Sequence, residues 1–303
     1  MDRAYRKGLL LVFAAGLLWA LISPAGKGLI QAGVEPPTVA FFRVVVVLLL
    51  SGPYLLLRKR EALVVAPSRL LFLLFYGGFG VAASYVGYMM SLRWLSVPFA
   101  LLLHYTFPLM TLVGAAFITG ERPLRPQVFA AGLILSGVAF PMFGSGAALS
   151  GCFSPPGLFW GLLAALAMAL QSLYGRLSGK GGSAISTVTL FFYAHLFAAF
   201  WLGLGKSLGP GWADLGRITA GQWALIGALG IFGSLVAYAI FYVGLRDVDA
   251  STASLAATVE IIGGVVLTAF LLNQMPQRAE VAGCLLIITG LFLNARSPQS
   301  AKA

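Results

Sequence analysis

The sequence contains few acidic residues, cysteines and histidines. Only nine of its 303 residues are Asp or Glu, and it has two cysteines and two histidines. Cys152 falls in a polar connector and Cys284 in an apolar run, so neither a disulfide framework nor a redox motif is predicted. The two histidines, His104 and His195, lie far apart and have no Cys or Asp beside them, which argues against a metal site. No cofactor and no metal ion are therefore expected.

The sequence also lacks the features of nucleotide-driven and nucleic-acid-binding proteins. It has no phosphate-binding loop of the pattern Gly-x-x-x-x-Gly-Lys-Ser/Thr, which argues against direct coupling to ATP. The net charge is +11, but the Lys and Arg residues stand at the ends of apolar runs. Nucleic-acid binding needs a clustered basic face, so no nucleic-acid partner is expected.

What the sequence has in abundance is apolar residues. Hydrophobic residues make up 59% of the chain, charged residues 10%, and the mean hydropathy is +0.93. So much apolar surface cannot be buried in one soluble core, so the chain is predicted to lie in lipid. Apolar runs of about 20 residues match membrane-spanning helices rather than barrel strands. An all-α polytopic membrane protein with ten spans is expected, at 8–30, 37–57, 70–92, 96–119, 127–145, 157–177, 184–206, 222–245, 250–272 and 279–295.

The N-terminal run has some features of a signal peptide. Arg3, Arg6 and Lys7 precede an apolar stretch from Leu9 to Ile22. The stretch is long for a signal, and Lys27 does not suit a small-residue cleavage site. An uncleaved first span is therefore predicted.

Basic residues are distributed unequally between the two sides of the predicted bundle. With the N-terminus inside, fourteen Lys or Arg residues fall on the inner side, five fall on the outer side, and Arg43 lies in a span. The positive-inside rule then predicts that both termini are cytoplasmic. The inner residues are Arg3, Arg6, Lys7, Arg58, Lys59, Arg60, Arg69, Arg122, Arg125, Arg176, Lys180, Arg246, Arg296 and Lys302. The outer residues are Lys27, Arg93, Lys206, Arg217 and Arg278.

The two halves of the sequence are alike. Identical residues recur at a constant offset of 153, for example Gly80 with Gly233 and Tyr85 with Tyr238. A polar, turn-rich break divides the chain into 1–145 and 157–303, with 146–156 as an extracytoplasmic linker. Five spans per half is an odd number, so the second half must enter the membrane from the opposite side. Such inverted repeats are common in secondary transporters that work by alternating access.

Several segments resemble the EamA family of the drug/metabolite transporter superfamily. The first span reads GLLWALISPAGKGLI, the second VAFFRVVVVLLL, and the fourth LLLHYTFPLMTLVGAAFITGERP. These are similar to the family's Leu-Trp start with a later Lys, its Phe-x-Arg opening, and its mid-helix Pro followed by Gly-Glu-Arg-Pro. The second half departs from the family pattern: Glu260-Ile261 replaces Glu-Pro, and Asn273-Gln274 replaces Gly-Glu. The resemblance implies two five-helix repeats and metabolite movement, often amino-acid export, across a bacterial inner membrane.

Ionisable residues within spans are the first candidates for a binding site. They cost about 2.5 to 3.5 kcal/mol to insert and usually face a cavity or a partner. Glu260 near mid-span is interpreted as an amine or cation ligand or a proton carrier; the alternative is a structural partner for Arg43 or Lys27. Arg43 and Lys27 can bind a carboxylate, or they can extend to water near the ends of their helices.

Polar and aromatic side chains at helical spacing extend this set. Trp19, Ser23 and Lys27 recur every four residues on one face, His104 shares a face with Phe107, and the tyrosines fall mid-span. The predicted substrate-binding residues are Trp19, Ser23, Lys27, Phe42, Arg43, Tyr85, Met89, His104, Tyr105, Gln171, Tyr238, Tyr242 and Glu260. No catalytic residue is predicted.

The functional prediction is a secondary transporter in the bacterial inner membrane that exports amino acids or related small metabolites, with proton coupling, ion coupling and exchange left open. One alternative is an intramembrane enzyme acting on a lipid or a small amphipathic substrate. It would need a nucleophile with a base, or paired carboxylates, at spanning depth. The other is a receptor or scaffold, which has no need of pseudo-symmetric halves. The fifth and tenth spans, apolar throughout, can face lipid or a second copy of the chain.

Overall fold

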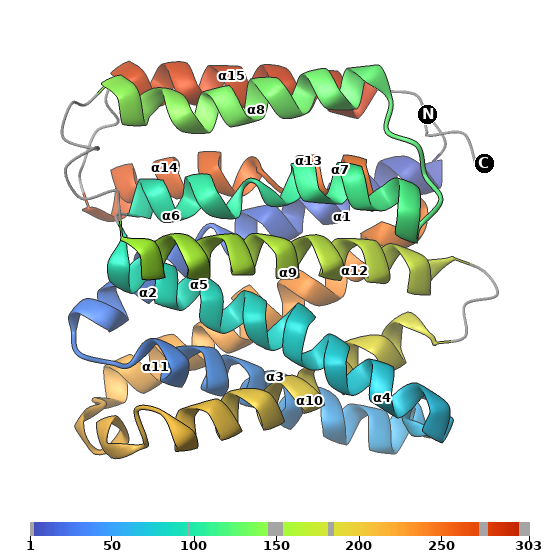
Figure 1. The fold of residues 1–303 in the computed structure, drawn as a ribbon, viewed down its shortest axis with the longest axis vertical. Coiled ribbons are helices and arrows are strands. Elements are labelled where there is room, and N and C mark those ends of the chain that lie inside the picture. Colours follow the sequence, from blue (N-terminus) through green and yellow to red (C-terminus); the bar gives the residue numbers. More distant parts are fainter. Residues whose placement is uncertain (1–2, 96, 145–153, 181–184, 273–277, 297–303) are drawn as a thin grey trace.

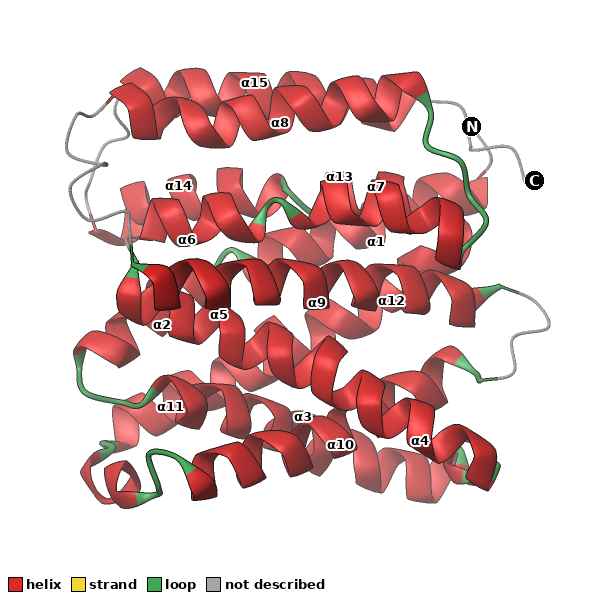
Figure 2. Cartoon of the chain, viewed as in Figure 1, coloured by secondary structure: helices red, strands yellow, loops and turns green. Residues whose placement is uncertain are grey.

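A computed structural model describes residues 3–95, 97–144, 154–180, 185–272 and 278–296, and within these ranges the chain is helical and contains no strand (Figure 2). The helices of the first half are α1 Arg3–Trp19, α2 Ile22–Gln31, α3 Pro36–Arg58, η1 Arg60–Leu63, α4 Pro67–Tyr76, η2 Gly77–Ala82, α5 Ala83–Trp94, α6 Val97–His104, α7 Phe107–Ile118 and α8 Arg125–Gly144. Those of the second half are α9 Pro155–Gly179, α10 Thr187–Leu208, η3 Ala213–Arg217, α11 Ala220–Ala228, η4 Leu229–Val236, α12 Ala237–Asp247, α13 Ala250–Ala256, α14 Val259–Leu272 and α15 Arg278–Arg296.

Nine helical stretches of the described chain are long and apolar enough to cross a membrane. They begin and end within about five residues of nine of the expected spans, because the length of the apolar run sets the length of a spanning helix. The remaining expected span corresponds to α8, whose apolar part Arg125–Phe140 is shorter. A membrane-embedded helical bundle is therefore established, and a count of ten crossings stays a prediction. Cys152, Asn273, Gln274 and most of the expected linker 146–156 lie outside the described residues.

The helices pack in pairs that are related by exchanging the two halves. Helix α1 packs along α12, and its counterpart α9 packs along α5. Helices α8 and α15, last in their halves, form a pair at one side of the bundle, and α3 packs against α10 (Figure 1). The buried apolar side chains extend through these contacts, so the core lies between the halves rather than inside either one.

The third span of each half contains a π-helical segment at the same place. Segment η2 begins at Gly77 and packs on α10, and η4, which includes Gly230 at the offset of 153, packs on α3. A Cβ atom at Gly77 would lie 2.6 Å from Phe197, and one at Gly230 would lie 2.6 Å from Val46. Glycine is required at both positions because the neighbouring helix approaches closely. These segments hold the third span of one half against the second span of the other.

Three spans are interrupted near their middle. The chain makes a short turn between α1 and α2, between α6 and α7, and between α13 and α14. At the last two turns a threonine hydroxyl donates to the carbonyl three residues earlier, Thr106 to Leu103 at 2.7 Å and Thr258 to Leu255 at 2.6 Å. The ninth span is thus interrupted even though it lacks the proline of the family pattern, because a local threonine bond replaces the helical one.

Candidate functional site

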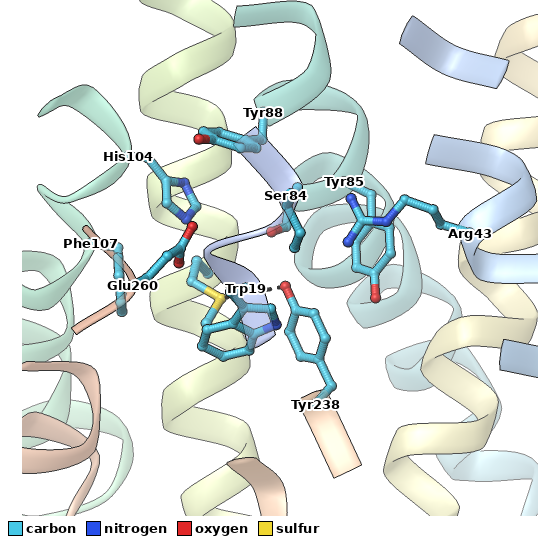
Figure 3. A pocket seen from close by; sticks show the side chains of 11 residues that line it. Trp19, Arg43, Ser84, Tyr85, Tyr88, His104, Phe107, Tyr238 and Glu260 are labelled. Atoms are coloured by element: carbon cyan, nitrogen blue, oxygen red, sulfur yellow. Dashed lines mark hydrogen bonds between the residues drawn. The ribbon is translucent and has the colours of Figure 1, made fainter. Parts of the chain in front are cut away.

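A small cavity lies within the bundle, where both halves contribute side chains (Figure 3). Its volume is about 30 Å³. The lining residues are Trp19, Ile22, Arg43, Ser84, Tyr85, Tyr88, His104, Phe107, Met168, Tyr238 and Glu260. They come from α1, α2, α3, α5, α6, α7, α9, α12 and α14, so the cavity exists only when the two halves are assembled.

All three helix interruptions meet at this cavity. Trp19 is the last residue of α1, and Ile22 is the first residue of α2. His104 ends α6, Phe107 begins α7, and Glu260 is the second residue of α14. Broken helices at membrane depth expose backbone groups and helix ends, which is how many transporters form sites for charged ligands. The interruptions therefore place both polar side chains and helix termini around one space.

Arg43 is buried on one side of the cavity, and its side chain is only 3% exposed. Its Nε donates to the Ser234 hydroxyl at 3.1 Å, and Nη2 donates to the Gly233 carbonyl at 3.4 Å. The guanidinium lies over the Tyr85 ring, with 4.6 Å between Cζ and the ring centroid. Of the two interpretations drawn from the sequence, the one in which Arg43 extends to water is therefore wrong. None of these partners carries a negative charge.

Glu260 lies on the other side of the cavity from Arg43, and it is 7% exposed (Figure 3). Within the described chain no ion pair joins Glu260 to Arg43 or to Lys27, which removes the structural ion pair considered from the sequence. Tyr105, Tyr88 and Arg43 are close enough to act electrostatically on the carboxyl group. Lys27 instead donates to the carbonyls of Leu92 and Leu95 at the end of α5. The carboxyl group of Glu260 thus has no cationic side chain of its own.

Several buried polar atoms near the cavity have no hydrogen-bond partner among the described residues. They include the indole Nε1 of Trp19 and the Nδ1 of His104. A buried donor or acceptor left without a partner costs about 1–3 kcal/mol. Such atoms beside a cavity mark places where a ligand or water is expected to bind.

Aromatic rings form the walls between the two charged groups. Trp19 and Tyr238 lie 4.8 Å apart between ring centroids, and Tyr85 stacks on Tyr238 at 5.7 Å. Tyr88 packs on His104 at 4.8 Å, and its hydroxyl bonds that of Ser23 at 2.7 Å. The site therefore offers an apolar, polarisable surface with one basic and one acidic end.

Six of the thirteen side chains predicted from the sequence line the cavity. These are Trp19, Arg43, Tyr85, His104, Tyr238 and Glu260. Ser23 reaches it indirectly through Tyr88, and Tyr105 lies beside Glu260. The other five lie elsewhere: Lys27 at the end of α5, Phe42 against Trp223, Met89 against Gly26, Gln171 on the Gly80 carbonyl, and Tyr242 on the Tyr76 hydroxyl.

The sequence prediction missed five lining residues. Tyr88 and Phe107 each lie three residues from a predicted residue, Tyr85 and His104 respectively, so helical spacing was a usable signal. Ser84 lies one turn before Tyr88 and shares that signal. Ile22 and Met168 are apolar residues in apolar helices, and nothing in their local sequence distinguishes them from ordinary core residues.

No metal-binding cluster of three or more His, Cys, Asp or Glu side chains occurs in the part of the chain that the structure describes. The two histidines lie in different places, one in the cavity wall and one behind it. His104 lines the cavity, whereas His195 bonds the Tyr85 hydroxyl at 3.3 Å and the Phe191 carbonyl at 2.8 Å. His195 thus supports Tyr85 from behind the cavity.

Glu121 joins the two halves at one end of the bundle. Two residues after the end of α7, Gly120 is left-handed with φ of 70° and turns the chain so that Glu121 contacts the second half. Its carboxylate accepts hydrogen bonds from Arg176 at 2.7 Å and from the backbone N–H of Ala250 at 3.2 Å. Lys180 forms a longer ion pair with it at 3.4 Å. The Gly-Glu pair of the fourth span is therefore a helix stop combined with a link between halves.

The surroundings of Glu121 fix its charge. Burial alone would raise the pKa of its carboxyl group, but the hydrogen bond and charge of Arg176, the N–H of Ala250 and the charge of Lys180 together hold the pKa below its ordinary value of 4.5. A carboxyl group with a lowered pKa in the folded state stabilises the fold above its unfolded pKa. That stability is lost as the pH falls through the folded pKa.

Replacing Glu121 with glutamine is expected to lower the melting temperature of the purified protein at pH 7 by roughly 5 °C. The change leaves Arg176 without its anion, at a cost of about 3 kcal/mol. The difference from the unmodified protein should shrink as the pH falls below 4.5 and disappear below the lowered pKa of folded Glu121, where both proteins lack the charge. Thermal unfolding in detergent between pH 3 and pH 8 measures this.

The matched control is Glu35→Gln. Glu35 pairs with Arg93 at 2.8 Å, but the two side chains are 31% and 45% exposed, so the pair contributes at most about 1 kcal/mol. Equal shifts for the two variants would show that Glu121 has no special role in joining the halves.

Asp214 makes the corresponding link at the opposite end. It accepts hydrogen bonds from the buried Lys206 at 2.9 Å and from the hydroxyl of Thr38. The backbone N–H of Glu35, just before α3, donates to it at 3.3 Å. Lys206 and Asp214 both belong to the second half, whereas Thr38 and Glu35 belong to the first, so at this end hydrogen bonds to the paired Asp214 connect the halves.

The comparisons with known proteins agree with this architecture. The profile of the EamA-like transporter family matches residues 6–143 and 155–296, one segment in each half. A solved structure titled only "Crystal structure of protein" aligns with 95% of this chain and 96% of its own, with a TM-score of 0.76 and 21% identity, which concerns the fold alone. No curated protein matches.

Proposed function

Because the chain belongs to the EamA-like transporter family, we propose that it is a secondary transporter that exports amino acids and closely related zwitterionic metabolites. The proposal places it in a bacterial inner membrane with both termini in the cytoplasm. The observation that carries it is the pair of buried, oppositely charged side chains Arg43 and Glu260, which line one cavity without forming an ion pair with each other.

Arg43 is suited to hold the substrate carboxylate. Its guanidinium carries five N–H groups, more than the two acceptors Ser234 and Gly233 can use, so donors remain for a ligand. Stacking on Tyr85 fixes the plane of the fork, and a fixed fork binds a carboxylate with two parallel hydrogen bonds.

Glu260 is suited to hold the substrate ammonium group. A buried carboxylate without a counter-ion is costly, and an ammonium group in the cavity would supply that counter-ion. The ring of Tyr88, also in the wall, adds a surface that attracts cations. A zwitterion would thus neutralise both buried charges in one binding event.

The helix ends at the cavity favour the same class of ligand. Ile22, Phe107 and Glu260 lie in the first turns of α2, α7 and α14, where backbone N–H groups give a partial positive charge. This field stabilises a carboxylate, whether it belongs to Glu260 or to a substrate. The aromatic walls between the charged ends suit an apolar substrate side chain.

The size of the cavity supports alternating access. Its volume of about 30 Å³ is far below the roughly 300–1,000 Å³ of sites that hold small molecules. The halves must therefore move apart for a substrate to enter, and the hydrogen bonds from Arg176 to Glu121 and from Thr38 and Glu35 to Asp214 are the contacts that would open on one side at a time. Glu260 can bind either a proton or the substrate ammonium group, but not both at once. Export of the substrate would then be coupled to entry of a proton.

The lipid-facing surface is consistent with either a monomer or a pair of chains. Helices α8 and α15 pack on each other and expose apolar side chains such as Phe129 and Leu285. The proposal includes a homodimer that forms through α8 and α15, because a second copy of the chain can cover these exposed apolar side chains as lipid does.

The test uses purified protein in liposomes loaded with a labelled amino acid that has an apolar side chain. Export should be competed by the unlabelled amino acid, whereas the corresponding amine without the carboxylate and the N-acetyl derivative without the ammonium should each compete about 100-fold less well. Liposomes without protein give the background. If both single-charge analogues compete as well as the amino acid, the zwitterion proposal is wrong. If the protein converts the compound chemically, it is not a simple transporter.

A further inference from the structure

A second, larger cavity is lined by residues at the end of the bundle where α12 ends and α10 begins. Figure 1 shows that α1 and α8 begin and α15 ends on the same side. Its volume is about 720 Å³. It is bounded by the end of α3, segment η1, the starts of α4 and α10, and the end of α12. The lining residues are Lys59, Glu61, Ala62, Val64, Val65, Ala66, Ser68, Arg69, Ile185, Ser186, Val188, Thr189 and Arg246.

The charge of this cavity is positive. Its lining contains three basic residues, Lys59, Arg69 and Arg246, and one acidic residue, Glu61. The net formal charge of the lining is therefore +2. All three basic side chains are exposed, and none forms an ion pair with a described residue. The neighbouring Arg60, by contrast, donates to the Leu56 carbonyl and is not among the lining residues. The cavity therefore contains a concentrated positive charge that the described protein does not compensate.

Two helix starts add to the same field. Ser68 lies in the first turn of α4, and Val188 lies in the first turn of α10. The N–H groups of a first helical turn attract anions, and phosphate in particular. At α10 the Thr189 N–H is already capped by Ser186, and at α4 the Arg69 N–H bonds the Ala66 carbonyl. Ser68 and Val188 therefore supply the N–H groups that remain. Helix starts alone would not define a site, but here two of them open into a cavity that already holds three unpaired cations.

The rim of the cavity is apolar and exposed. Val64, which lines it, is 80% exposed. Leu57 and Leu71, each two residues from a basic lining residue, are 76% and 63% exposed. In a membrane protein these side chains contact acyl chains. A soluble anion would gain nothing from such a rim, whereas a lipid would bind with its headgroup in the cavity and its chains along the rim.

We propose that this cavity binds the phosphate of an anionic phospholipid headgroup from the leaflet on the side of the two termini. Basic pockets between helices on the cytoplasmic side of a membrane are suited to such headgroups. Lys59 and Arg69 belong to the first half and Arg246 to the second, so the bound phosphate bridges the halves. The bound lipid therefore stabilises the arrangement of the halves that holds these three basic side chains close together.

The test is a binding titration by native mass spectrometry of the purified chain with phosphatidylglycerol and with phosphatidylcholine of the same acyl chains. Phosphatidylglycerol is expected to bind at least tenfold more tightly. Each of Lys59→Gln, Arg69→Gln and Arg246→Gln should weaken it about fivefold, and the triple variant about 100-fold. The matched control is the triple variant Arg3→Gln, Arg6→Gln, Lys7→Gln, which removes three exposed charges at the same end but outside the cavity.

Each other outcome would overturn the proposal. Equal affinity for the two lipids would show that charge is not recognised, and equal losses in the two triple variants would show that only the general charge of this end matters. Inorganic phosphate tests for a soluble ligand. The melting temperature of the protein is measured with inorganic phosphate and with phosphatidylglycerol. If both raise it equally, the cavity binds a free anion and not a lipid. The single variants change exposed side chains, so they keep the test valid should the triple variant fail to fold.

Discussion

Glu260→Gln is expected to reduce amino-acid export from liposomes by about 100-fold while leaving the amount of folded protein unchanged. Glutamine has the size of glutamate but no charge, so the ammonium group of the substrate loses its buried counter-ion. Truncating one partner of a buried charge pair typically costs 2–5 kcal/mol, or roughly 30- to several-thousand-fold. The measurement is the initial rate of efflux of the labelled amino acid.

The variant also separates the two roles proposed for Glu260. If this carboxyl group alternates between a proton and the substrate ammonium, export by the variant should no longer respond to a pH gradient across the liposome. The control is Glu35→Gln, a carboxylate in an exposed ion pair at the end of the bundle, which should export at the normal rate. Wild-type rates in Glu260→Gln would exclude the carboxylate from the transport site.

Arg43→Gln is expected to raise the substrate KM by about 100-fold. The change removes the buried positive charge opposite Glu260 and also the stacking on Tyr85. The loss should be specific for the carboxylate, so the amine analogue that lacks this group should be affected by less than about threefold. Arg43→Lys retains the charge but not the two-pronged geometry and is expected to fall between the two. Competition curves for the amino acid and its amine measure both effects.

The control for this experiment is Arg217→Gln, because Arg217 lies in the exposed segment η3. If Arg43→Gln weakens the amino acid and the amine equally, Arg43 has a structural role, through Ser234 and Gly233, rather than a role in substrate recognition.

Much of the fold could be predicted from the sequence because the bilayer imposes a length and a composition on each span. The expected span 37–57 is α3 at Pro36–Arg58, and the expected span 157–177 is α9 at Pro155–Gly179. The family and its two-repeat architecture were also predicted correctly. The interruptions were not, since the break after Ala256 depends on the Thr258 side chain rather than on a proline or glycine.

The candidate site was harder to predict because it depends on how each helix is rotated. Phe42 and Arg43 are adjacent, but successive residues on a helix point about 100° apart, so Arg43 faces the cavity and Phe42 packs on Trp223. Tyr238 and Tyr242 share a face, yet Tyr242 lies one turn further along and bonds Tyr76 instead. Apolar lining residues such as Met168 carry no chemical signal at all. Only packing decides which of them reach the cavity.

The paired π-helical segments have a consequence for the history of the chain. Segment η2 of the first half packs on α10 of the second, and η4 of the second half packs on α3 of the first. If the halves descend from one five-helix polypeptide, that ancestor already contained the wide turn, and two copies inserted in opposite directions would have made this contact twice around a twofold axis. After fusion of the two copies, mutations could change one half without changing the other. The pair Arg43 and Glu260 is accordingly not repeated: at the offset of 153 their counterparts are Leu196 and Phe107.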